Sequence, residues 1–114
     1  MTHDDELADR VREALSDEDG LTERRMFGGL GFMLDGHMVA AASSTGGLLL
    51  RVDPAQSERL VDGRGVIRFE MRGREMDGWL DVGRDVVADD EELARWLLHG
   101  VTYVRSLPPK PSRP

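Results

Sequence analysis

Hydrophobic positions near the start of the chain repeat at the spacing of a helix. Between residues 4 and 16, apolar side chains recur every three or four positions, and most of the others are charged. These apolar positions are Leu7, Val11, Ala14 and Leu15. The pattern predicts an amphipathic helix with one buried face. The acidic run that follows ends at Gly20, a residue type that readily adopts the left-handed conformation found after helices.

Short apolar runs separated by turn residues come next. We expect strands over residues 22–27, 31–34, 38–43 and 48–52, with Gly-Gly, Asp-Gly and Ser-Ser-Thr-Gly-Gly between them. Regularly spaced turns of this composition indicate antiparallel hairpins.

A second, shorter helix is predicted after these strands. Asp53 has the character of an N-cap, Pro54 suits the first helical position, and Gln56 is placed to close a capping box. The helix should end before the Asp62-Gly63 turn.

Two further strands are predicted over residues 67–71 and 75–82, joined by a turn at Gly73. Alternation assigns one set of side chains to the core: Ile67, Phe69, Met71, Leu80 and Val82. It assigns the other set to the opposite face: Arg68, Glu70, Trp79 and Asp81. A sheet with one solvated face is usually antiparallel.

The last predicted element is the longest helix. It begins at Asp89 or Asp90, and Glu92 is placed to form a capping box. Its apolar stripe comprises Leu93, Trp96, Leu97, Val101, Val104 and Leu107. Pro108 and Pro109 end the helix, and we expect the basic, proline-rich tail 108–114 to be disordered.

These elements predict one α+β domain over residues 1–107. The order is helix, three or four strands, helix, two strands, helix, which gives two layers with the helices on one face of an antiparallel sheet. The 114 residues suffice for a core without cross-links.

The composition narrows the function. The chain has no cysteine, so disulfides, thiolate catalysis and cysteine zinc sites are excluded. No apolar run reaches the length of a signal or membrane helix, and we expect a cytoplasmic protein without membrane contact. The net charge is −7, and the last ten residues contain Arg105, Lys110 and Arg113 but no acid, so the body is more acidic still. This balance argues against direct contact with nucleic acid, which requires a positive surface.

One segment resembles a known family. Residues 25–36 pack large apolar side chains around glycines, and the residues that carry the pattern are Met26, Phe27, Gly28, Gly29 and Gly31. The segment is similar to the signature of the TfoX/Sxy N-terminal domain family, bacterial proteins whose best-known members regulate natural competence. Residues 48–53, residues 91–96 and the Pro-Pro-Lys ending are similar to family features too.

The resemblance implies a fold related to secretion-chaperone-like proteins. It also implies a transcription-associated protein partner, such as a transcription factor or a polymerase component, because the competence regulators work with an activator of the cyclic-AMP-receptor type. The sequence ends without the C-terminal helical domain of those regulators, so we expect a stand-alone N-terminal domain and leave a role in competence open.

Several motifs with possible chemistry have simpler interpretations. Gly28 to Gly31 lack the Gly-Lys-Ser/Thr and helix of a P-loop and suit a turn or bulge. The histidines, His3, His37 and His99, do not have the spacing of metal ligands. Ser43 and Ser44 have turn composition rather than that of a nucleophile elbow, and the acids 89–92 suit a helix start. We therefore predict no catalytic, cofactor-binding or metal-binding residue.

Five arginines between Arg64 and Arg84 suggest an alternative function. With the basic tail, the arginines at positions 64, 68, 72, 74 and 84 could form a nucleic-acid-binding face. Acidic residues alternate with them, which favours a solvated face with ion pairs, and the chain lacks the aromatic ladder of single-strand binders.

The remaining candidate is an interaction surface on the sheet face away from the helices. Alternation places Trp79, Leu49 and Met33 there, beside Arg51 and Arg68, a composition typical of interface cores. The alternative is that Trp79 only covers the end of the sheet. We expect a non-enzymatic regulatory or adaptor module that acts through protein contacts, with a homodimer through the sheet as one form. A small-ligand binder or enzyme with a pocket near Gly28 to Phe32 is the third hypothesis.

Overall fold

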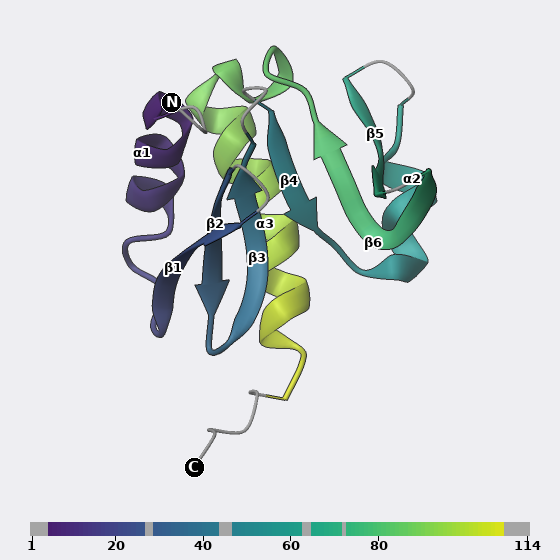
Figure 1. The fold of residues 1–114 in the computed structure, drawn as a ribbon. Coiled ribbons are helices and arrows are strands. Elements are labelled where there is room, and N and C mark those ends of the chain that lie inside the picture. The colour runs from purple at the N-terminus through teal and green to yellow at the C-terminus, as the bar shows by residue number, and fades with distance from the viewer. Residues whose placement is uncertain (1–4, 27–28, 44–46, 63–64, 72, 109–114) are drawn as a thin grey trace.

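A computed structural model gives the fold (Figure 1), and it describes residues 5–26, 29–43, 47–62, 65–71 and 73–108. Six strands form one sheet in the order β1-β2-β3-β4-β6-β5, and every neighbouring pair is antiparallel. The strands are β1 (Leu21–Met26), β2 (Gly29–Leu34), β3 (His37–Ala42), β4 (Leu48–Arg51), β5 (Val66–Met71) and β6 (Arg74–Val82). The predicted antiparallel α+β fold is confirmed.

The helices lie mainly on one face of this sheet. They are α1 (Asp5–Ala14), α2 (Ser57–Leu60) and α3 (Asp90–Arg105), with 3-10 turns η1 (Pro54–Gln56) and η2 (Val86–Ala88). Helix α3 runs behind β3 and β4 in Figure 1 and contacts both strands, and α1 packs against α3 and β3. The short α2 lies beside β6. The predicted two-layer arrangement with helices on one face is therefore present.

Local sequence signals explain several boundaries. Asp35 and Gly36 both have positive φ, 51° and 87°, as a two-residue type I′ hairpin turn requires between β2 and β3. Asp53 caps η1 as predicted, since its Oδ1 accepts a hydrogen bond from the Ala55 N–H at 2.9 Å.

Two capping predictions were wrong. Gln56 does not close the capping box, because its side chain makes no hydrogen bond to Asp53 among the described residues, and it instead lines a groove described below. Asp89 precedes α3 but its side chain makes no cap hydrogen bond, and Glu92 pairs with Arg95 at 2.6 Å instead of closing a capping box. The ion pair one turn along the helix surface takes the carboxylate away from the helix start.

The core lies between the helices and the sheet. Strands β2, β3, β4 and β6 supply its centre, and fully buried side chains there include Phe32, Leu34, Val39, Leu48, Leu50 and Leu80. Helix α1 contributes Leu7, Ala8 and Val11, and Leu15 follows in the turn after the helix. Ala14, which the spacing assigned to this stripe, is exposed, and Ala8 occupies the buried position instead.

The predicted orientation of β5 was wrong by one residue over residues 66–68, before the register with β6 shifts. Val66 is 1% exposed and faces the core, whereas Ile67 is 47% exposed. The pairing with β6 sets this orientation, because Val66 lies opposite Val82 and Arg68 opposite Leu80, and directly paired residues share a face. Adjacent apolar residues at 66 and 67 are compatible with either orientation.

Two arginines, Arg10 and Arg105, form hydrogen bonds between the helices and neighbouring segments. Arg105, at the end of α3, donates to Asp35 Oδ2 at 2.8 Å, to Glu18 Oε1 at 3.0 Å and to the Asp19 carbonyl at 2.8 Å. Arg10 of α1 donates to Asp90 Oδ1 at 2.9 Å and to the Val87 carbonyl at 2.7 Å. Arg105 is therefore a structural residue of the described fold rather than part of a free basic tail. The tail beyond Pro108 lies outside the described residues.

Gly100 sets the distance between α3 and the sheet. A Cβ at this position would lie 2.9 Å from Leu50 Cδ1, 2.9 Å from Val39 Cγ2 and 3.0 Å from the Arg51 carbonyl oxygen. The backbone oxygen cannot rotate away as a methyl group can. A side chain here therefore requires α3 and β4 to move apart by a few tenths of an ångström.

The first prediction concerns this contact. Gly100→Ala should lower the free energy of unfolding by about 1–2 kcal/mol, because overpacking outweighs the gain of about 1 kcal/mol in helix propensity. Denaturant unfolding measures the change. Ala94→Gly, on the exposed side of the same helix, is the control and should cost about 1 kcal/mol through propensity alone. A stabilising Gly100→Ala would show that the contact is loose.

A second prediction follows from the ion pair that joins α1 to β1. Arg12 donates to both carboxylate oxygens of Glu23, at 2.5 and 2.8 Å, and this hydrogen bonding lowers the pKa of Glu23 against the opposing effect of burial. Its stabilisation is therefore present above the carboxyl's ordinary pKa and is lost as the pH falls through the lowered value.

Glu23→Gln should cost up to about 1 kcal/mol at neutral pH, since the pair is partly exposed. The difference from the wild type should disappear in acid, and urea unfolding across a pH series measures it. Glu13→Gln, at an exposed position of α1 with no ion pair among the described residues, is the control and should cost less than Glu23→Gln at neutral pH. A cost that is independent of pH would contradict this assignment.

Candidate protein-interaction surface on the open face of the sheet

The face of the sheet opposite α1 and α3 is called the open face here. Leu48, Leu50 and Leu80 point toward the helices and are fully buried, so their neighbours along each strand point to the open face. The register confirms this, because Leu49 lies opposite both Ala41 and Asp81. Eight central residues define the surface: Gly31, Met33, Ala41, Leu49, Arg51, Ile67, Trp79 and Asp81.

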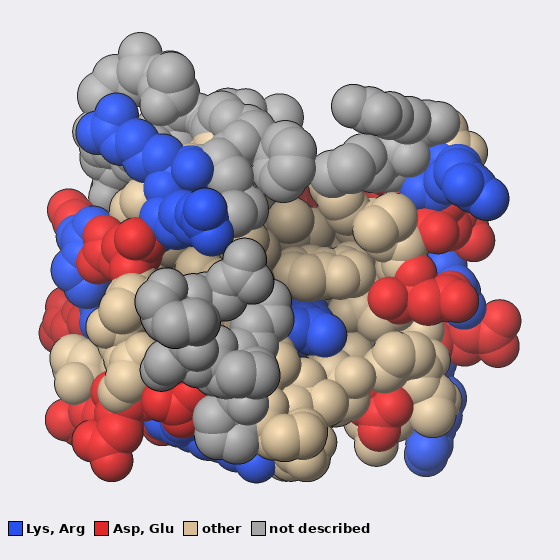
Figure 2. Space-filling view, turned by 60° about the horizontal axis from the view of Figure 1, so that its bottom comes forward, with Lys and Arg blue, Asp and Glu red and all other residues tan. Residues whose placement is uncertain are grey.

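Much of this surface is small or apolar. Gly31 and Ala41 form a low centre, Leu49 and Met33 are partly buried, and Ile67 is 47% exposed. Figure 2 is turned by 60° from the view of Figure 1, so that the lower end of the molecule comes forward. Uncharged surface lies at and to the right of the centre of that view, a single basic group lies within it, and most other charged groups lie toward the sides.

Arg51 is held by aromatic rings rather than by acids. Arg51 is the last residue of β4, so its side chain can reach past the end of the strand toward α3. Its guanidinium carbon lies 5.8 Å from the ring centroid of Trp79, which is opposite it on β6, and 5.5 Å from that of Tyr103 on α3. Both distances are within the range of cation–π attraction. Within the described part of the chain, Arg51 forms no ion pair, and it is partly buried. Its charge therefore remains uncompensated by the described residues of the open face.

Asp81 is the acidic counterpart on the same face. It lies opposite Leu49 on one side and Ile67 on the other. Burial among these neighbours raises the pKa of its carboxyl above the ordinary value. The pairs Leu49–Asp81 and Arg51–Trp79 are two positions apart in the register, and Arg51 and Asp81 form no ion pair with each other. Among the residues that the structure describes, Arg51 and Asp81 are thus unpaired charges of opposite sign at the centre of the open face, and Arg24, opposite Gly31, adds an exposed cation on the edge strand β1.

Arg68 does not belong to this surface, contrary to the prediction. It is opposite Leu80 and therefore lies on the face that carries the helices. Three carboxylates surround its guanidinium, at 3.2 Å (Glu58), 3.0 Å (Asp77) and 4.0 Å (Glu75). The wrong placement of Arg68 follows from the wrong orientation predicted for residues 66–68 of β5.

The ion pairs of Arg68 also weaken the alternative prediction, a nucleic-acid-binding face formed by the arginines between positions 64 and 84. Arg64 and Arg72 lie outside the described residues, while Arg74 and Arg84 are exposed. Arg68, the central member, is neutralised by three acids and so adds no net positive charge to a phosphate-binding surface.

The glycine signature has a structural explanation where it is described. Gly29 begins β2 at a point where a Cβ would lie 2.5 Å from the Ala42 carbonyl oxygen, so no side chain fits. Gly31 lies on the open face, and Phe32 is fully buried in the core rather than beside a pocket. Met26 ends β1, and Phe27 and Gly28 lie outside the described residues.

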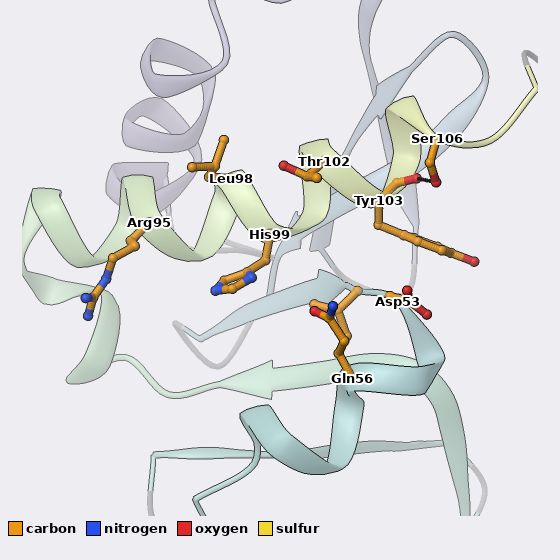
Figure 3. A pocket seen from close by; sticks show the side chains of 9 residues that line it. Asp53, Gln56, Arg95, Leu98, His99, Thr102, Tyr103 and Ser106 are labelled. Carbon is orange, nitrogen blue, oxygen red and sulfur yellow. Dashed lines mark hydrogen bonds between the residues drawn. The ribbon is translucent and has the colours of Figure 1, made fainter.

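The sequence analysis missed a groove between α3 and the segment after β4. Its volume is about 520 Å³, and Figure 3 shows His99 and Tyr103 of α3 facing Gln56 and Asp53. The His99 ring lies 5.5 Å from that of Trp96. These side chains come from positions far apart in the sequence without a motif to link them, so no sequence signal could have found the groove.

The histidines are not gathered into a metal site. His37 Nε2 lies 2.7 Å from the Pro108 carbonyl, whereas His99 lines the groove on α3, and His3 is outside the described residues. Across the described ranges, no three histidine or carboxylate side chains converge in a way that could hold an ion.

The fold and surface define a small α+β domain with helices on one face of an antiparallel sheet and an open second face. The TfoX N-terminal domain family matches residues 4–102, and the chain belongs to this family. No curated protein and no solved structure matched it. In the parts of the chain that the structure describes, no helix has the length and apolar character needed to cross a membrane.

Proposed function

We propose that this chain is a non-enzymatic regulatory or adaptor module that acts through protein–protein contacts on the open face. The observation that carries the proposal is the position of Arg51 between the rings of Trp79 and Tyr103, two residues from Leu49 on the same strand. Interface cores combine aromatic, aliphatic and arginine side chains in this way, and they are depleted in other charges.

Family membership supports the regulatory part of the proposal. The chain belongs to the TfoX N-terminal domain family, and its resemblance to the competence regulators suggests a transcription-associated partner, such as a transcription factor or a polymerase component. Because fold does not fix function, this partner is a proposal about class only.

A pull-down tests the surface and the partner together. Tagged protein is incubated with nuclease-treated lysate of the cell that makes it, and the recovered proteins are quantified by mass spectrometry. Trp79→Ala combined with Leu49→Ala should reduce recovery of the partner at least tenfold, about 1.4 kcal/mol, because both side chains lie at the centre of the open face.

Leu98→Ala is the matched control. Leu98 is a large hydrophobic residue on α3 that is 61% exposed, so its removal tests whether any exposed leucine matters. Recovery should be unchanged, and thermal unfolding should show that the double variant is folded. Unchanged recovery with the folded double variant, or recovery that depends on intact nucleic acid, would contradict the proposal.

A further inference from the structure

Two groups of opposite charge lie in a fixed arrangement at the centre of the open face. Arg51 and Asp81 lie on the neighbouring strands β4 and β6, two register positions apart, with Leu49 and Trp79 completing the square between them. Each is partly buried and has no ion-pair partner among the described residues. A protein that covers this face must supply an acid to Arg51 and a base to Asp81 at the same spacing.

We infer that the protein that covers the open face is a second copy of this chain, in a two-fold dimer in which Arg51 of each copy pairs with Asp81 of the other. This inference rests on the proposed function, since it names an occupant for the same surface. The two-fold axis lies between the two facing sheets and crosses the line from Arg51 to Asp81 at right angles, at its midpoint. It therefore places each arginine over the aspartate of the other copy. Two-fold interfaces are self-complementary in this sense.

The shape of the face suits this packing. Two sheets pack face to face at about 10 Å, with side chains from both inner faces interdigitating. Ala41 and Leu49 lie close to the two-fold axis and therefore face the same residues of the other copy, and the small Ala41 lets the two sheets approach closely. The rings of Trp79 and Tyr103 hold the Arg51 side chain in place before association, which reduces the entropy lost on pairing.

The net negative charge of the chain opposes its self-association. Each copy carries −7, so two copies repel one another at long range. At physiological ionic strength the screening length is about 8 Å, so this repulsion is weak while contacts inside the interface persist. A heterologous partner that uses the open face would compete with the second copy.

A charge-swap experiment tests the dimer. Arg51→Glu and Asp81→Arg are prepared separately and then mixed, and sedimentation equilibrium at physiological salt measures association. The wild type should be dimeric, and each variant alone at least tenfold weaker, about 1.4 kcal/mol, because like charges face each other across the axis.

The mixture of the two variants should form a heterodimer. The glutamate introduced in one variant then faces the arginine introduced in the other, and the remaining native pair, Asp81 of the first variant and Arg51 of the second, is intact. Restoration in the mixture excludes misfolding as the cause of dissociation in either variant.

Glu91→Arg, an exposed charge reversal on α3, is the matched control and should remain dimeric. A monomeric wild type, variants that each dimerise normally, or a mixture that stays monomeric would each overturn the inference.

The charge-swap experiment and the pull-down can fail independently, so the dimer and the proposed function are tested separately. If the wild type is monomeric but the pull-down recovers a partner through Trp79 and Leu49, the inference fails and the proposed function stands. If the swap restores a dimer but no other protein depends on the open face, the inference stands and the heterologous partner fails.

Discussion

The close contact between α3 and β4 at Gly100 determines how the rest of the molecule is arranged. Without a side chain there, the helix lies directly against Leu50, Val39 and the Arg51 carbonyl. Leu93, Leu97 and Val104 then fill the space on the same side of the sheet. Helix α1 packs beside α3, so both long helices cover one face. The opposite face remains open as a consequence, and the same contact brings Tyr103 within reach of Arg51.

Charge pairing separates the structural arginines from the one proposed to have a function. Arg12, Arg68 and Arg105 each contact carboxylates of other elements, and such partly exposed pairs stabilise a fold only modestly. Arg51 contacts aromatic rings instead, so its position is fixed while no described acid compensates its charge. Asp81 also lacks an ion-pair partner among the described residues, and burial raises the pKa of its carboxyl. Both residues lie on the open face.

Sequence reasoning identified the features that depend on local physics. The apolar spacing of α1, the Asp35-Gly36 turn and the Asp53 cap each follow from a few neighbouring residues. The placement of Leu49 and Trp79 on one face, away from the core, followed from strand alternation and agrees with the register. The predictions that failed concern features set by contacts between residues far apart in the sequence. The orientation of β5 is decided by Val82 and Leu80 on β6, and that one error moved Arg68 to the wrong face. The groove beside His99 arises only when α3 meets the segment after β4.

The measurement that most directly tests the central claim is carbene footprinting of the folded chain, read by mass spectrometry. Labelling of side chains is compared between dilute buffer and a concentrated, nuclease-treated lysate of the cell that makes the protein. If the open face is the contact surface, Leu49 and Trp79 lose labelling while Leu98 on α3 does not. Unchanged labelling at Leu49 and Trp79, or protection centred on Leu98, would contradict the account.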